Sequence, residues 1–238
     1  MARKMLIFFH KLIDWMVVVA VVLLFLICLY ATVDAYFVYA GASDSSILRF
    51  KPSVDNPGSL ARLSKDAIAW ITLEDTNIDY PIMQGKTNEE YLNKDPYGNY
   101  SLTGSIFLDC RNDKNFSDPY SLVYGHHMEY SAMFGALDLY GNAAYLDSHK
   151  NGTLITASGQ VYRILVFASC KADANEKSVF QPSYYSYEDL TAFLNKTAMV
   201  FHREVYTKDA KVIALSTCQS AETFDRMLVF GILTEKTN

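Results

Sequence analysis

The chain has 238 residues, of which 50% are hydrophobic and 20% are charged. This composition excludes an intrinsically disordered chain, because the apolar residues are numerous enough to form a substantial core. The formal net charge of -5 and the lack of a Lys/Arg-rich stretch argue against a nucleic-acid-binding protein, so no nucleic-acid partner is expected.

The first predicted element is an apolar helix near the N-terminus. No charged residue occurs between Asp14 and Asp34, and a helix over residues 15–33 would be roughly 28 Å long, close to the hydrocarbon thickness of a bilayer. The segment is preceded by three basic residues, Arg3, Lys4 and Lys11. The positive-inside rule therefore predicts a cytoplasmic N-terminus and an exported remainder. A cleavable signal peptide is the alternative, but the apolar stretch is longer than a typical signal core, which favours an uncleaved membrane anchor.

These features divide the chain into four parts. Residues 1–14 are expected in the cytoplasm and residues 15–33 in the membrane. Residues 34–55 are expected to form an extracellular stalk, because the stretch GASDSS within them offers little to bury. Residues 56–238 are expected to form the folded, extracellular domain, which begins with a short helix after Pro57.

Eight short strands are predicted in this domain, separated by Gly, Pro, Asn and Asp. They cover residues 69–75, 78–84, 103–109, 121–126, 152–158, 161–169, 211–218 and 226–235. Two helices interrupt them, at residues 131–140 and, between the sixth and seventh strands, at residues 186–200. A closed eight-stranded β-barrel is the predicted fold, since closure removes the exposed sheet edges.

The second helix has a clear start signal and a predicted buried face. It opens with a Ser-x-x-Asp cap at Ser186. The buried face is expected to contain Leu190, Phe193, Leu194 and Met199, which recur at helical spacing.

Candidate chemistry lies at three strand ends. Cys218 closes the strand LSTC, Arg226 opens the next strand, and His126 ends another strand in YGHHM. A cysteine near an imidazole and a guanidinium can attack a carbonyl, protonate a leaving amine and stabilise an oxyanion. Spacing alone leaves open an ordinary core cysteine, a solvated turn histidine and a surface arginine. No arrangement of His and carboxylates has metal-ligand spacing, so neither a metal nor another cofactor is expected.

The remaining cysteines match no CxxC or zinc pattern. Cys28 lies in the apolar helix, which leaves Cys110 and Cys170 in the exported domain. They can form a disulfide or remain as small packed thiols, and the second alternative is favoured.

The order of these motifs resembles that of the sortases, the membrane-anchored cysteine transpeptidases of Gram-positive bacteria. The resemblance covers about residues 64–233 and includes ITLEDTNIDYPIMQ, YLNKD, TGSIFLD, YGHHMEYSAMF and LSTC. Ala214 stands where the family signature TLxTC has its first Thr. The helix between the sixth and seventh strands is similar to the insertion that distinguishes class B sortases.

The resemblance implies a role for each candidate residue. It implies Cys218 as the nucleophile, His126 as the general acid/base and Arg226 as the clamp on the oxyanion or substrate. Ser216 and Thr217 are the implied substrate-binding residues. The neighbouring His127 is the alternative to His126, but the family histidine directly follows the glycine.

The resemblance also implies a function and a location. The enzyme would cleave a C-terminal sorting motif, similar to NPxTx or LPxTG, in secreted proteins and form a Cys thioester. It would then transfer them to an amine of a peptidoglycan precursor or a pilin, on the outer side of a Gram-positive cell membrane. Two alternatives are a hydrolytic, membrane-anchored cysteine peptidase and a non-enzymatic cell-surface β-barrel that binds a ligand.

Overall fold

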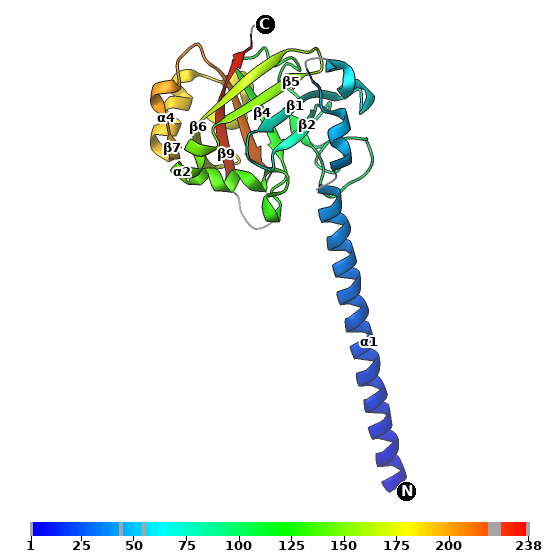
Figure 1. Ribbon diagram of the computed structural model, residues 1–238. Helices are drawn as coiled ribbons and strands as arrows, with labels where there is room; N and C mark the ends of the chain where they lie inside the picture. The colour runs from blue at the N-terminus through cyan, green and yellow to red at the C-terminus, as the bar shows by residue number, and fades with distance from the viewer. Residues whose placement is uncertain (1, 43–44, 54–55, 219–224, 237–238) are drawn as a thin grey trace. The chain divides into compact units, whose positions relative to one another are not determined.

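The computed structural model describes residues 2–42, 45–53, 56–218 and 225–236, and the chain divides into the units Met1–Ser43 and Asp44–Asn238. The first unit contains the helix α1 (Ala2–Ala42) (Figure 1). Within it, the stretch Arg3–Tyr36 contains an 18-residue window with a mean hydropathy of 3.0, and none of that window is buried. By length and composition, this is the one helix in the described residues able to cross a membrane. The limits of the anchor and the stalk stay a prediction.

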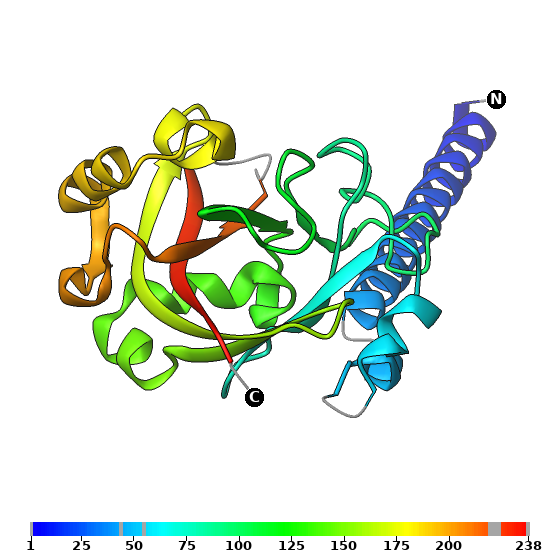
Figure 2. The same ribbon diagram turned by 90° about the horizontal axis from the view of Figure 1, so that it is seen from above.

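The second unit contains a closed barrel of eight strands, as predicted (Figures 1 and 2). Their bounds are β1 (Ala67–Leu73), β2 (Asp79–Met83), β3 (Ile106–Leu108), β4 (Tyr120–Gly125), β5 (Asn151–Thr156), β6 (Val161–Asp173), β8 (Lys211–Thr217) and β9 (Asp225–Glu235). The strands follow the order β5-β1-β2-β3-β4-β8-β9-β6, and pairing of β5 with β6 closes the ring. The long, curved β6 runs antiparallel to β9 (Figure 2).

Two neighbouring strands in the middle of this sheet are almost wholly buried. β4 is buried at every position, and β8 is buried at every position after Lys211. They pair in parallel, and both therefore read as near-continuous apolar runs rather than as alternating strands. The core cluster around them contains large aromatic side chains, including Trp70, Tyr120, Phe167 and Phe230.

Short helices connect the strands or cover the barrel. They are η1 (Ser45–Phe50), η2 (Pro57–Arg62), η3 (Glu129–Ser131), η4 (Phe134–Gly141), α2 (Ala143–Ser148), α3 (Lys177–Phe180), η5 (Pro182–Tyr184), α4 (Tyr187–Thr197) and η6 (Arg203–Val205). The helix predicted at residues 131–140 is thus shorter and of 3-10 type. The backbone just before η4 has positive φ angles at Ser131 and Met133, which are incompatible with a continuous right-handed helix.

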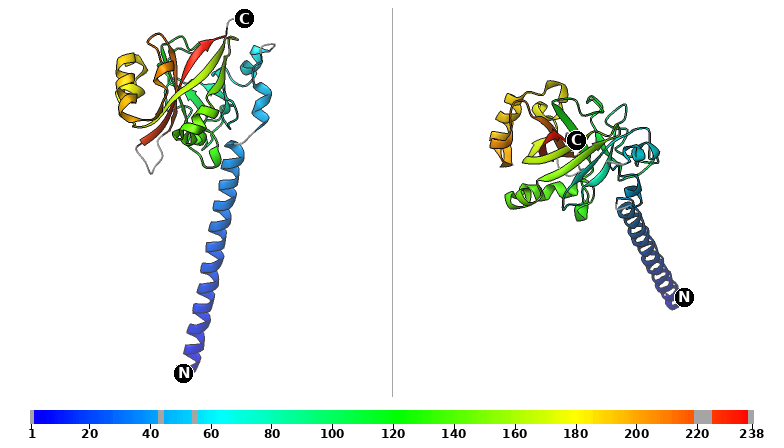
Figure 3. Two further views of the ribbon diagram at one scale, coloured as in Figure 1. Left: turned by 60° about the vertical axis from the view of Figure 1, so that its left-hand side comes forward. Right: turned by 45° about the horizontal axis from the view of Figure 1, so that its top comes forward.

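The helix between the predicted sixth and seventh strands is α4. Its cap is present, because the Ser186 side chain accepts a hydrogen bond from the Asp189 backbone N–H, 3.1 Å away. Leu190 and Leu194 are buried, as expected. Figure 3 shows α4 on the outside of the barrel, where it contacts β6 and the additional strand β7.

The strand β7 (Ala198–Phe201) was not predicted, because the sequence pattern extended the helix to Val200. β6 continues to Asp173 and leaves an edge beyond the ring, to which β7 adds antiparallel. Met199 lies on this strand and is 51% exposed, so its predicted place on the buried helix face is wrong.

Candidate active site

Three neighbouring strands bring the predicted catalytic residues into one row. Gly125 on β4 lies opposite Thr217 on β8, so the next residues along this parallel pair are His126 and Cys218. Ser216 lies opposite Leu228 on the antiparallel β9, and continuing that register by two places puts Cys218 opposite Arg226. The Cys218 backbone N–H donates to the Gly125 carbonyl oxygen at 2.8 Å, so the β4–β8 contact does extend to the cysteine.

The same three side chains line one cavity of about 460 Å³. The cavity is bounded by β4, β8 and β9, by the long connection between β2 and β3, and by the segment that leads into α3. Its other lining residues are Asn88, Glu89, Leu92, Asn93, Phe107, Tyr124, Ala174 and Phe180. The row is therefore accessible to a ligand.

His126 is held by a main-chain acceptor across the cavity wall. Its Nε2–H donates to the Leu92 carbonyl oxygen at 2.8 Å, which leaves Nδ1 as the ring nitrogen able to take up a proton when the imidazole is neutral. The preceding residue must be small, since a Cβ at Gly125 would collide with the side chains of Ile106 and Phe134. The alternative histidine, His127, is exposed and does not line the cavity.

The Cys218 thiol is neutral at rest. Burial raises the pKa of Cys218 to about 12, and the positive charge of Arg226 lowers it by less than burial raises it. A protonated thiol of this kind needs a base to become a nucleophile. His126 is in the position to supply one, because it shares the cavity with the thiol.

Arg226 lies against aromatic rings, and no carboxylate of the described residues forms an ion pair with it. Its guanidinium carbon lies 5.0 Å from the centre of the Phe180 ring and 5.9 Å from that of Tyr124. Its Nε is buried and has no hydrogen-bond partner among the described residues. Within the part of the chain that the structure describes, Arg226 forms no ion pair, so it keeps donors for a bound molecule.

The two implied substrate-binding residues lie behind the cavity wall. The Thr217 hydroxyl accepts a hydrogen bond from the Met227 backbone N–H at 3.0 Å, which ties the start of β9 to the end of β8. The Ser216 hydroxyl is buried and donates to the Thr217 carbonyl oxygen at 3.0 Å. Neither side chain lines the cavity, and their contact with substrate stays a prediction.

The other cysteines are free thiols. Cys170 is fully buried in the core, and Cys110 is half-buried and outside the cavity lining. The disulfide between them, left open by the sequence, is not formed, and the alternative of two packed thiols holds.

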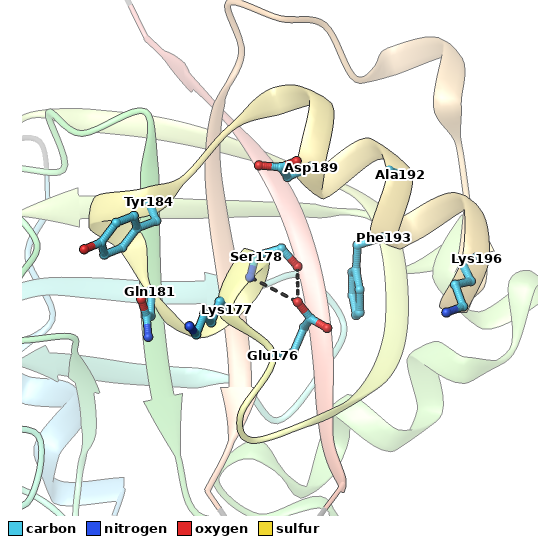
Figure 4. Close-up of a pocket in the computed structure, with 9 residues that line it drawn as sticks. All are labelled: Glu176, Lys177, Ser178, Gln181, Tyr184, Asp189, Ala192, Phe193 and Lys196. Carbon is cyan, nitrogen blue, oxygen red and sulfur yellow. Dashed lines mark hydrogen bonds between the residues drawn. The ribbon is translucent and has the colours of Figure 1, made fainter.

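A larger hollow, of about 760 Å³, lies beside α3 and α4 (Figure 4). None of His126, Cys218 and Arg226 lines it. The carboxylate of Glu176 in this hollow already has hydrogen-bond partners, because it accepts from the backbone N–H and the hydroxyl of Ser178 at 3.1 and 2.7 Å. The smaller cavity is the candidate active site, because it contains the nucleophile.

Sequence reasoning missed several residues of the cavity wall. Asn88, Leu92 and Phe180 come from connections between strands, and only the folded chain brings them to the cysteine. Leu92 contributes a main-chain carbonyl oxygen, which any residue type would supply. Its place in YLNKD, a stretch that carries the family resemblance, was the available signal.

The barrel and its row of imidazole, thiol and guanidinium are the features of an enzyme that transfers acyl groups through a cysteine. The sortase-domain family model matches residues 71–234, more than half of the chain. The protein therefore belongs to the sortase family, whose class B members are cysteine transpeptidases.

The relatives place the chain in class B. Sortase B of Staphylococcus aureus is 32% identical over 176 residues, with 72% of this chain and 71% of the relative covered. Sortase B of Listeria monocytogenes is 33% identical over 191 residues, covering 76% and 75%. The crystal structure of a Streptococcus pyogenes class B sortase involved in pilus biogenesis is 36% identical and superposes with a TM-score of 0.68, covering 74% of this chain and 96% of that one.

Proposed function

We propose that the protein cleaves a C-terminal sorting motif of secreted proteins and joins them to an amine at the cell surface. The observation that carries this proposal is the row of His126, Cys218 and Arg226 across β4, β8 and β9, which lines a single cavity. A neutral thiol beside an imidazole and a guanidinium supplies a nucleophile, a proton carrier and an oxyanion donor.

In the first half of the reaction, a sorting-motif peptide bond is exchanged for a thioester. His126 takes the proton of the Cys218 thiol as Sγ attacks the carbonyl carbon of the motif's Thr. Arg226 donates hydrogen bonds to the oxyanion or to the neighbouring backbone. When the C–N bond breaks, His126 gives the proton to the leaving nitrogen, and the C-terminal fragment departs with a new amino group.

In the second half, a neutral amine attacks the thioester carbonyl. The C–S bond breaks and an amide bond forms. His126 accepts the proton that the amine loses and returns it to Sγ, which restores the neutral thiol. The side chains alone balance the protons of both halves, so the reaction as written uses no cofactor.

The proposed substrates rest on the family. The motif is expected to be similar to NPxTx or LPxTG, and the acceptor is a peptidoglycan precursor or a pilin amine. One structural relative is a Staphylococcus aureus sortase B–substrate complex, which is 29% identical with a TM-score of 0.69, covering 78% of this chain and 88% of that one. The Streptococcus pyogenes relative is involved in pilus biogenesis, and this supports a pilin amine as the second proposed acceptor.

The test uses the full-length protein in detergent with synthetic peptides that contain an NPxTx or an LPxTG core. Mass spectrometry is run with and without triglycine or a lysine-containing peptide as acceptor. We expect cleavage between Thr and the next residue and, with an acceptor present, an amide-linked product in excess of the hydrolysed acid. Hydrolysis alone would identify a peptidase, and binding without cleavage would identify a non-enzymatic module.

We also propose that α1 anchors the protein in a Gram-positive cell membrane with the barrel outside. The apolar segment Arg3–Tyr36 and the basic residues near its start motivate this orientation. Protease added to intact protoplasts should remove the barrel and leave a membrane-protected N-terminal fragment. If the full-length chain survives until the protoplasts are lysed, the barrel is cytoplasmic and this orientation is wrong.

A further inference from the structure

Behind the cavity wall lies a carboxylate with an unusually complete set of donors. Asp109, just after β3, is fully buried. It accepts hydrogen bonds from Arg111 Nε at 2.8 Å and Nη2 at 2.6 Å, and from the Arg111 backbone N–H at 3.0 Å. Burial by itself would raise the pKa of Asp109, but the hydrogen bonds and charge of Arg111, together with the hydrogen bond from Asn88, hold the pKa below its ordinary value. The pair is therefore ionised at neutral pH.

The Asp109–Arg111 ion pair also forms hydrogen bonds with the two residues whose rings lie against Arg226. The Tyr124 hydroxyl donates to Asp109 Oδ2 at 3.2 Å. Arg111 Nη2 donates to the main-chain carbonyl oxygen of Phe180 at 2.8 Å, which ties α3 to the end of β3. Arg226 has no ion pair among the described residues, and its guanidinium lies against these two rings.

A third part of the cavity wall depends on the same pair. The Asn88 amide donates to Asp109 Oδ2 at 2.9 Å, and its oxygen accepts from the Cys110 backbone N–H at 2.8 Å. Asn88, Tyr124 and Phe180 all line the cavity, whereas Asp109 and Arg111 do not. The pair thus holds three wall residues from outside the cavity.

We propose that Asp109 and Arg111 are positioning residues that set the place of the Arg226 guanidinium through Tyr124 and Phe180. This inference rests on the proposed role of Arg226 in catalysis. Removing the Arg111 charge leaves the buried Asp109 carboxylate unpaired and risks unfolding. Arg111→Lys is the sharper variant, because the ammonium keeps the charge but cannot reproduce the fork that binds Asp109 and Phe180 together.

The test is a double-mutant cycle in the full-length protein, with steady-state cleavage of a sorting peptide by Arg111→Lys, Arg226→Lys and the double variant. We expect Arg111→Lys to lower kcat by about tenfold or more, because small displacements of a catalytic group are costly. KM should change by less than about twofold. In the Arg226→Lys background, Arg111→Lys should lower kcat by less than about twofold, because the group it positions is gone.

Tyr124→Phe is the second variant, and it tests the positioning role of the Asp109–Arg111 pair if Arg111→Lys does not fold. It removes the hydroxyl bonded to Asp109 and keeps the ring, and its effect on kcat should likewise disappear in the Arg226→Lys background. Thr72→Val is the matched control, since the Thr72 hydroxyl donates to another carboxylate, Asp79, at 2.8 Å and away from the cavity. Its kcat should be normal.

The outcomes separate the two proposals. A near-normal kcat for Arg226→Lys alone contradicts the catalytic role of Arg226 and removes the basis of the inference. A second outcome is that Arg226→Lys is impaired, but Arg111→Lys or Tyr124→Phe lowers kcat by the same factor in the wild-type and the Arg226→Lys backgrounds. The Asp109–Arg111 pair then acts independently of Arg226, and only its positioning role is overturned.

Discussion

Cys218→Ala should abolish thioester formation and lower cleavage of a sorting peptide by at least about four decades, because alanine has no nucleophile to replace Sγ. The fold should survive, since the change deletes one atom at the cavity surface. Mass spectrometry of the acyl-enzyme and chromatography of the cleaved peptide measure the first effect, and thermal unfolding measures the second.

Cys170→Ala is the matched control for this loss. Burial also raises the pKa of Cys170 to about 12, so the two thiols are similar in protonation. They differ in surroundings, because Cys170 packs in the core and only Cys218 lines the cavity with His126 and Arg226. Cys170→Ala should lose some stability and keep its turnover. Normal cleavage by Cys218→Ala would refute the thioester mechanism, whatever the control does.

Arg226→Lys should reduce kcat by at least about a hundredfold even though the positive charge is kept. Loss of one oxyanion donor typically costs about 3–4 kcal/mol of transition-state stabilisation, and an ammonium cannot replace the planar fork of the guanidinium. The hydrogen bonds matter most as charge moves onto oxygen, so kcat should fall more than peptide affinity. Arg226→Ala should show a similar loss, and neither change should shift the melting temperature much.

Arg203→Lys provides the comparison. Arg203 also lies over an aromatic ring, with its guanidinium carbon 5.4 Å from the centre of Tyr187, but it is outside the cavity. Its turnover should be unchanged. The alternative for Arg226 is a surface pair with Asp225 or Glu222. Among the described residues Asp225 forms no ion pair, and Glu222 lies outside these residues. A near-normal rate for Arg226→Lys would reduce this arginine to a packing role.

Local sequence patterns were sufficient to predict much of the fold. The charge-free stretch between Asp14 and Asp34 predicted a long apolar helix, because the apolar character and the length of such a stretch are properties of the local sequence. Each of the eight barrel strands was predicted near its observed place, and the cap at Ser186 marked the start of α4. The strand β7 was missed because it is defined by its pairing with an edge of β6, a tertiary contact that the local sequence pattern does not contain.

For the site, the sequence by itself indicated that the Cys218 thiol and the Arg226 guanidinium lie close together, whereas their catalytic roles were implied by the family resemblance. Cys218 and Arg226 are separated by one short connection, and antiparallel pairing of the two flanking strands is enough to bring them together. The neighbouring histidine depended on the family resemblance, since spacing alone did not place His126 beside the cysteine.

Only the tertiary structure decided which groups surround Cys218 and Arg226. Parallel pairing of β4 with β8 brings His126 to Cys218 from a distant part of the chain, and the Leu92 carbonyl oxygen sets which ring nitrogen of His126 is free. Arg111 reaches Phe180 through another main-chain carbonyl oxygen. Every residue carries such an oxygen, so these contacts leave no trace in residue types, and they follow from the three-dimensional course of the backbone alone.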